Sequence, residues 1–174
     1  MSVRYARQIV LPEIGEEGQA LLAKARILVV GAGGLGSPAL LYLTAAGVGL
    51  GSHGGCIGLI DDDRVDASNL QRQILFRESD QATAKVEAAS QHLAALNSET
   101  HLVSHQARLT AANAFEILGA YDVIIDGSDN FSTKYLLNDA AVKLGKQVVY
   151  GSILGFEGQI SVFWGQKGPC YRCI

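Results

Sequence analysis

Short apolar runs alternate with helix-like patterns along most of the chain. Residues 27–30 are four apolar positions, mostly β-branched, and this pattern predicts a buried strand. Similar runs predict strands at 56–60, 100–105, 123–125 and 148–151, and helical periodicity predicts helices at 13–24, 39–46, 82–96, 113–118 and 132–144. Strands alternating with helices indicate an α/β fold, here a Rossmann-like, mostly parallel sheet with helices on both faces.

Three other stretches complete the expected organisation. Residues 157–164 alternate between apolar and polar positions, which predicts a C-terminal antiparallel extension of the sheet. Residues 1–12 are polar and mixed, and by themselves they indicate an exposed arm. Residues 49–56 are rich in glycine and predict a flexible loop at the end of the sheet opposite any ligand.

A glycine turn directly follows the first predicted strand. Gly31, Gly33, Gly34 and Gly36 precede Ser37 and Pro38, which we expect to be the N-cap and the first helical position of the next helix. Strand, glycine turn and helix together direct free backbone N–H groups at an anion, so we expect a nucleotide phosphate here. An ordinary tight turn remains an alternative, and the motif does not distinguish a dinucleotide from ATP.

Composition narrows the class of protein. The chain has 174 residues, 48% of them hydrophobic, which predicts one soluble domain with a substantial core. Its net charge of −3 gives no overall basic surface for nucleic acid or an anionic membrane, and no apolar stretch is long enough to span a bilayer. Three cysteines, two of them in a terminal Cys-x-x-Cys, favour a reducing cytoplasm and metal or redox use over disulfides.

Polar residues follow several predicted strands, where open α/β sheets bind their ligands. Asp61 ends the second strand and is a candidate ribose ligand, although a solvated acidic loop is the alternative. Lys85 lies in the first turn of a helix, where a cation opposes the helix dipole, so a nearby anion would explain it. With Arg72 and Asp129 it forms the set of charges that adenylyl transfer from Mg-ATP requires, whereas hydride transfer has no evident use for them.

Seven motifs in order resemble the ThiF/MoeB/HesA-type adenylyltransferase family, bacterial relatives of ubiquitin-activating enzymes. The resemblance covers residue 4 to the end of the chain and rests on these segments: Arg4-Tyr-x-Arg7-Gln-Ile, Gly31-Ala-Gly-Gly-Leu-Gly36, Ser68-Asn-Leu-Gln-Arg-Gln73, Lys85, Asp126-Gly-Ser-Asp-Asn130, Phe156-Glu-Gly-Gln159 and Cys170-Tyr-Arg-Cys173. It implies a single ATP-binding adenylyltransferase domain over residues 1–174, as the N-terminal portion of a longer enzyme.

The resemblance also implies an activity, cofactors and partners. Such enzymes use Mg-ATP to adenylate the C-terminal glycine of a ubiquitin-like sulfur-carrier protein ending in Gly-Gly, in thiamin, molybdopterin or related sulfur biosynthesis. Arg7 would reach the active site of the other subunit in a homodimer, and Arg72, Lys85 and Asp129 would be catalytic. The nucleotide would contact residues that the motifs supply: Gly31, Gly33, Gly34, Gly36, Asp61, Ser68, Asn69, Leu70, Gln71, Arg72, Gln73, Lys85, Asp129 and Asn130, with Asp129 also holding Mg²⁺.

The sequence departs from the family pattern in its metal site. Family members hold Zn²⁺ with two Cys-x-x-Cys pairs, and this chain supplies only Cys170 and Cys173. We therefore expect weak or no zinc binding unless a longer chain completes the site, and poor order after residue 163. His53 and Cys56 in the glycine-rich loop do not make a metal site. Alternative functions are a nucleotide- or carrier-binding remnant without turnover, and an NAD-dependent oxidoreductase supported by the glycine motif alone.

Overall fold

The computed structural model describes residues 3–174. The chain alternates between strands and helices nearly as the hydrophobic pattern predicts. The helices and strands are α1 (Ala6–Ile9), α2 (Gly15–Lys24), β1 (Arg26–Val30), α3 (Gly36–Ala45), β2 (Cys56–Ile60), α4 (Lys85–Leu96), β3 (Leu102–His105), α5 (Ala114–Gly119), β4 (Val123–Asp126), α6 (Phe131–Leu144), β5 (Gln147–Leu154) and β6 (Glu157–Phe163).

The strands form one sheet in the order β3-β2-β1-β4-β5-β6. Strands β1 to β5 run parallel and β6 pairs antiparallel with β5, which confirms the Rossmann-like fold and its antiparallel extension. The strand order reverses between β1 and β4, and in open α/β sheets ligands bind outside the carboxyl ends of the strands at such a point. The topology therefore places the expected site where β1, β2 and β4 end.

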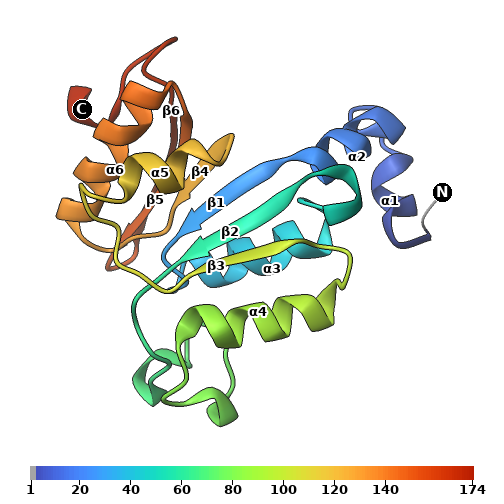
Figure 1. Cartoon of the computed structure of the whole chain (residues 1–174), viewed down its shortest axis with the longest axis horizontal. Helices are drawn as coiled ribbons and strands as arrows, with labels where there is room; N and C mark the ends of the chain where they lie inside the picture. The colour runs from blue at the N-terminus through green and yellow to red at the C-terminus, as the bar shows by residue number, and fades with distance from the viewer. Residues whose placement is uncertain (1–2) are drawn as a thin grey trace.

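Alternating residues of each strand divide the core between the two faces of the sheet. On one face, Ile27 and Val29 of β1 pack with α3 and α4, and on the other Leu28 and Val30 pack with α5 and α6 (Figure 1). Burial of both faces explains why the central strands are continuously apolar rather than alternating. Within residues 3–174, no helix is both long and apolar enough to cross a lipid bilayer.

The predicted helices begin one to three residues away from the observed starts, and two of them show the reason. Helix α3 begins at Gly36, so Ser37 is inside the first turn; its hydroxyl donates to the carbonyl of Ala32 (3.0 Å) instead of capping the helix. Helix α4 begins at Lys85 rather than at residue 82, because Ala82 has a φ of +66° and its N–H donates to the carbonyl of Val65. Hydrogen bonding within the preceding loop overrides the helical pattern there.

Most side chains of residues 3–12 are exposed, as the composition predicts, but Tyr5 attaches the segment to the fold; residues 1–2 of the predicted arm lie outside the described residues. Tyr5 is 3% exposed, lies against Gly47 and accepts a hydrogen bond from the side chain of Asn97 (2.9 Å). The glycine-rich loop is likewise held in place, because Leu50 is buried and pairs with Thr100. It lies at the amino ends of the strands, as predicted, and therefore away from the expected site.

The expectation of poor order after residue 163 is also wrong. The ring of Tyr171 packs against Tyr150, and the backbone N–H of Tyr171 donates to the side chain of Asn138 in α6 (2.8 Å). Arg172 forms a two-pronged ion pair with Asp139, also in α6. Contacts with side chains distant in sequence fix this segment, and its own sequence gives no sign of them.

Candidate functional site

A cavity of about 680 Å³ opens at the carboxyl edge of the sheet, above β1, β2 and β4. It brings together most of the charged residues that the sequence singles out, although they come from four separate parts of the chain. The residues from those motifs that line it are Gly31, Gly33, Gly34, Asp61, Arg72, Gln73, Lys85, Asp129 and Asn130.

The glycine turn is shaped by close backbone contacts. Gly31 has a φ of +88°, and a Cβ there would lie 3.0 Å from the carbonyl oxygen of Gly127 in the turn after β4. A Cβ at Gly36 would lie 1.8 Å from the carbonyl oxygen of Gly31, so only glycine lets α3 start this close to β1. Gly36 therefore shapes the turn without lining the cavity, whereas Gly33 and Gly34 line it.

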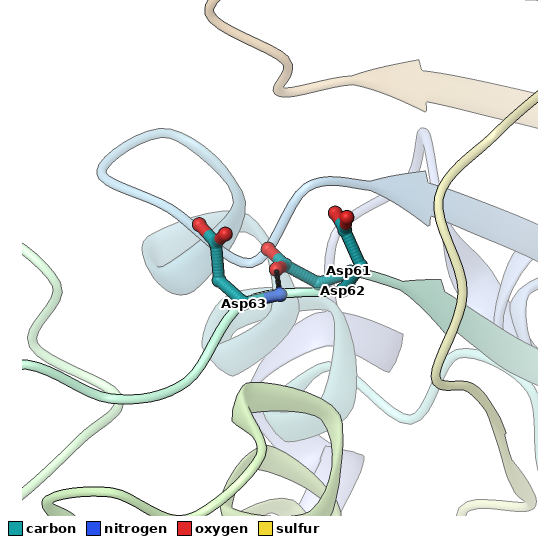
Figure 2. A group of neighbouring side chains, drawn as sticks. All are labelled: Asp61, Asp62 and Asp63. Atoms are coloured by element: carbon teal, nitrogen blue, oxygen red, sulfur yellow. Dashed lines mark hydrogen bonds between the residues drawn. The ribbon is translucent and has the colours of Figure 1, made fainter.

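Asp61 lies at the end of β2, where the sequence places it. One carboxylate oxygen accepts the N–H of Ala32 in the glycine turn (2.8 Å), and the other accepts the N–H of Asp63 (2.8 Å) (Figure 2). The carboxylate thus joins the end of β2 to the glycine turn and still faces the cavity. Each oxygen retains a lone pair, which leaves Asp61 able to accept a further hydrogen bond from a ligand hydroxyl.

Arg72 is held over the glycine turn by the loop that precedes it. Its guanidinium donates to the carbonyl of Ser68 (3.3 Å) and to the side chain of Asn69 (3.1 Å). Ser68 in turn donates its N–H to the Asp66 carboxylate, and hydrogen bonding from the side chain and the N–H of Ser68 lowers the pKa of Asp66. These loop residues orient the arginine rather than line the cavity.

The other residues of this motif face different surroundings. Leu70 packs against the core, and Gln71 is exposed; neither lines the cavity. Gln73 lines the cavity but is only 3% exposed, and its side-chain oxygen has no hydrogen-bond partner among residues 3–174. A buried amide oxygen without a donor is costly, so a donor from a ligand or water would satisfy it.

Lys85 is the first residue of α4, and its side chain is buried. Its ammonium lies 2.8 Å from a carboxylate oxygen of Asp63, whose side chain is 67% exposed. This ion pair offsets the unfavourable position of a cation at a helix N-terminus. The sequence indicated an anion near Lys85, and the structure places this carboxylate of the chain beside it.

Asp129 and Asn130 border the cavity in the turn after β4. The Asn130 side chain caps α6 by accepting the N–H of Thr133 (2.9 Å), whereas Asp129 is exposed. Asp129 therefore stands in the cavity wall with its carboxylate accessible to a ligand.

The carboxylate oxygens around the cavity suit a hard divalent cation as ligands. The carboxylates of Asp61, Asp62 and Asp63 each offer an oxygen within 4.8 Å of the others, and Asp129 lines the same cavity (Figure 2). Carboxylate oxygens of one or two residues, completed by water and phosphate, are the usual surroundings of Mg²⁺ in nucleotide sites. These residues fit a Mg²⁺ ion bound together with ATP.

The cysteines offer half of a zinc site. The sulfur atoms of Cys170 and Cys173 are 3.6 Å apart, and the N–H of Arg172 lowers the pKa of Cys170. In the part of the chain that the structure describes, no third His, Cys, Asp or Glu donor joins them, and Cys56 is buried at the amino end of β2. Structural zinc takes four protein ligands, so these residues alone do not fit it.

Sequence reasoning missed part of the cavity wall and cannot place one predicted residue in it. Ala107, Arg108 and Leu109 after β3 and Ser152 and Ile153 of β5 also line the cavity, but they belong to no motif. Arg7 lies exposed in α1, and it is not among the residues that line the cavity of its own chain.

Comparison with known proteins supplies a family and a fold. A model of the ThiF family matches residues 5–174. The chain is 49% identical over 176 residues to a "Sulfur carrier protein adenylyltransferase" of Thermus thermophilus, covering 98% of this chain and 63% of that protein. It is 50% identical over 161 residues to a "Probable adenylyltransferase/sulfurtransferase MoeZ" of Mycobacterium tuberculosis, covering 92% of this chain and 40% of that protein.

The curated relatives are longer than this chain, and the solved structures share its fold. With the "Adenylyltransferase and sulfurtransferase MOCS3" of Culex quinquefasciatus, also 50% identical, the match covers 38% of that protein. A crystal structure of E. coli MccB with succinimide superposes with a TM-score of 0.85 at 23% identity, covering 98% of this chain and 50% of that one. At that identity the superposition supports the Rossmann-like fold alone.

Proposed function

Because the chain belongs to the ThiF family, we propose that it adenylates the C-terminal glycine of a ubiquitin-like sulfur-carrier protein with Mg-ATP. The observation that supports this most directly is the convergence of Arg72, Lys85 and the aspartates on one cavity beside the glycine turn. Two cations and several carboxylates suit the stabilisation of a departing pyrophosphate and its metal.

The proposed chemistry needs no nucleophilic side chain from this protein. A carboxylate oxygen of the carrier's C-terminal glycine attacks the α-phosphorus of ATP and forms the acyl adenylate. The bond from that phosphorus to the oxygen bridging to the β-phosphate breaks, and pyrophosphate leaves. Negative charge grows on the leaving group, and positioned cations stabilise it without reorganisation during the reaction.

Each cavity residue has a role in this proposal. The glycine turn at Gly33 and Gly34 would hold phosphate with backbone N–H groups, and Asp61 would accept the ribose hydroxyls. Arg72 and Lys85 would contact the phosphates and offset the developing charge. Asp129 would ligate Mg²⁺, which when bound neutralises phosphate charge. Loop residues Ser68 and Asn69 would act by orienting Arg72.

Pyrophosphate exchange tests the reaction. A carrier ending in Gly-Gly should promote exchange of labelled pyrophosphate into ATP, and the same carrier lacking its last glycine should not. ATP binding without exchange would instead support a nucleotide- or carrier-binding remnant. NADH binding more tightly than ATP would support an oxidoreductase, for which the glycine turn is the sole support.

We further propose that the protein acts as a homodimer in the cytoplasm. Arg7 is an exposed cation in α1 with no hydrogen bond or ion pair to the rest of residues 3–174, so a partner subunit could receive it. The use of cysteine, with a single Cys-x-x-Cys, supports a reducing compartment. The net charge of −3 argues against a nucleic-acid or membrane partner. Sedimentation showing a fully active monomer at micromolar concentration would reject the dimer.

The pathway that we propose is thiamin, molybdopterin or related sulfur biosynthesis. Carriers from each branch, compared for KM in the exchange assay, would identify it. Zn²⁺ would bind through Cys170 and Cys173 only in a chain that supplies a second pair of cysteines.

A further inference from the structure

Two buried charges lie behind the cavity wall and have no part in the reaction as proposed. Asp126, the last residue of β4, is 2% exposed, and Lys134 of α6 is 5% exposed. The Lys134 ammonium lies 3.1 Å from one carboxylate oxygen of Asp126. A buried ion pair gains little stability over well-packed apolar residues, because both ions lose their hydration. The contacts of the pair therefore need an explanation besides stability.

The second oxygen of Asp126 shapes the turn that carries Asp129. It accepts both the N–H (3.0 Å) and the hydroxyl (2.6 Å) of Ser128. Gly127, between them, is pressed against the glycine turn, because a Cβ on it would lie 3.1 Å from the carbonyl oxygen of Gly31. Asp126 thus fixes the backbone between β4 and Asp129 from one side, and the glycine turn fixes it from the other.

Lys134 makes a second contact, with the backbone of β5. Its ammonium donates to the carbonyl of Gly151 (3.1 Å) and lies 4.6 Å from the centre of the Tyr150 ring. The pairing of β4 with β5 ends at Asp126 and Tyr150, so Gly151 is the first residue of β5 beyond that pairing. The lysine binds β5 just where β4 no longer does.

The residues after Gly151 form part of the cavity wall. Ser152 and Ile153 both line the cavity, while their strand pairs only with β6 from this point on. One ammonium therefore connects the turn before Asp129 with the start of the β5 extension. The Lys134 nitrogen thus contacts both the residue that precedes the Asp129 turn and the residue that precedes the β5 wall.

We propose that Asp126 and Lys134 are positioning residues that fix the distance between the Asp129 turn and the β5 wall. The catalytic consequence rests on the proposed function, since these walls would hold the metal-bound phosphates on one side and the attacking carboxylate on the other. A displacement of about 1 Å between reacting groups can cost about 10²-fold in rate. The pair acts through the residues that it holds and does not itself touch the substrates.

The test compares Lys134→Met with Lys134→Arg and with Lys143→Met. Methionine replaces the apolar stem of lysine as far as Cε but removes its charge and donors, whereas arginine keeps both charge and donors. Lys143 is an exposed lysine of the same helix, so Lys143→Met is the matched control. Amide hydrogen exchange of the nucleotide-free protein is measured with the urea midpoint and with the kcat and KM of pyrophosphate exchange.

Lys134→Met should raise amide exchange at 127–130 and 151–154 by at least about tenfold, with strands β1 and β2 unchanged, because local contacts rather than global unfolding are lost. It should lower kcat by about 10²-fold and change the KM for ATP by less than about threefold. Lys134→Arg should recover most of both effects, and Lys143→Met should match the wild type.

A double variant keeps the test decisive if Lys134→Met alone does not fold. Asp126→Asn with Lys134→Met removes both buried charges, and the amide oxygen of asparagine can still accept from Ser128. Protection should then return at 127–130 and remain low at 151–154, because methionine donates nothing to the carbonyl of Gly151.

The proposal is overturned if Lys134→Met leaves both segments protected, or if protection falls evenly over the whole sheet while kcat of the folded protein is unchanged. Equal recovery of both segments in the double variant also overturns it. Amide exchange needs neither ATP nor carrier, so it decides the positioning role separately. Absence of pyrophosphate exchange in the wild-type protein would reject the proposed function and not this result.

Discussion

Replacing Lys85 with methionine should separate catalysis from stability. The lysine side chain is 5% exposed, and the structure gives it one ionic partner, Asp63, whose side chain is 67% exposed. Loss of a pair open to solvent on one side costs about 0.2–1 kcal/mol. Loss of a cation from the first turn of α4 returns about 0.3–1 kcal/mol, because that cation opposes the helix dipole. The two changes nearly cancel, and the free energy of unfolding should stay within about 1 kcal/mol of the wild type.

The effect on the proposed reaction should be much larger. If the ammonium stabilises charge on the departing pyrophosphate, its removal costs about 3 kcal/mol, or 10²–10³ in rate. Arg72→Ala should behave in the same way, because its guanidinium lies over the glycine turn of the same cavity. Asp63→Asn frees the lysine from its ion pair and should affect kcat less than Lys85→Met does.

Urea unfolding and pyrophosphate exchange on the same preparations measure the two quantities. Lys24→Met is the matched control, since Lys24 is an exposed lysine in α2 at the other end of the sheet. Near-normal exchange by Lys85→Met at unchanged stability would refute the assignment of Lys85. A loss of exchange that follows a loss of folded protein would show that the lysine is structural.

Three further predictions concern the metal, acid stability and zinc. Asp129→Ala should abolish most Mg²⁺-dependent exchange, with partial rescue at high Mg²⁺, and an unchanged Mg²⁺ titration would remove Asp129 as a ligand. Burial acts to raise the pKa of Asp80, but hydrogen bonds from His92 and the Arg77 N–H hold it below its usual value. The contribution of this carboxylate to stability is therefore present above the unfolded pKa of about 3.9 and is lost as pH falls through the folded pKa. Asp80→Asn should flatten the acid limb of a curve of unfolding free energy against pH. An unaltered acid limb would contradict this. Metal analysis should find little zinc on the purified chain, and one zinc per chain surviving dialysis against a mild chelator would show that Cys170 and Cys173 have further ligands.

Strand and helix positions were predictable because their signals are local. The β2 strand, residues 56–60, is confirmed residue for residue, and α6 ends at the predicted Leu144, where Gly145 adopts a left-handed conformation. Errors occur where distant contacts override a local pattern. Tyr5 is buried through Gly47 and Asn97, which the polar composition of residues 1–12 does not reveal.

The candidate site shows the same division between local and distant information. The sequence placed Asp61, Lys85 and Asp129 after strands or at a helix start, and parallel strands bring such positions to one edge of a sheet. It could not indicate that Asp63 pairs with Lys85, or that Ser68 and Asn69 turn toward Arg72 instead of the cavity. Those orientations depend on the path of the loop between β2 and α4.

The sequence by itself determined the order of elements, the glycine turn and the edge of the sheet at which ligands bind. These follow from hydrophobic periodicity and from the backbone freedom of glycine, both of which act over a few residues. Tertiary structure alone decided that Lys134 reaches both Asp126 and Gly151, and that Ser152 and Ile153 line the same cavity as the glycine turn. Such contacts join residues on different strands and helices, and their geometry is set by how the sheet and its covering helices pack together.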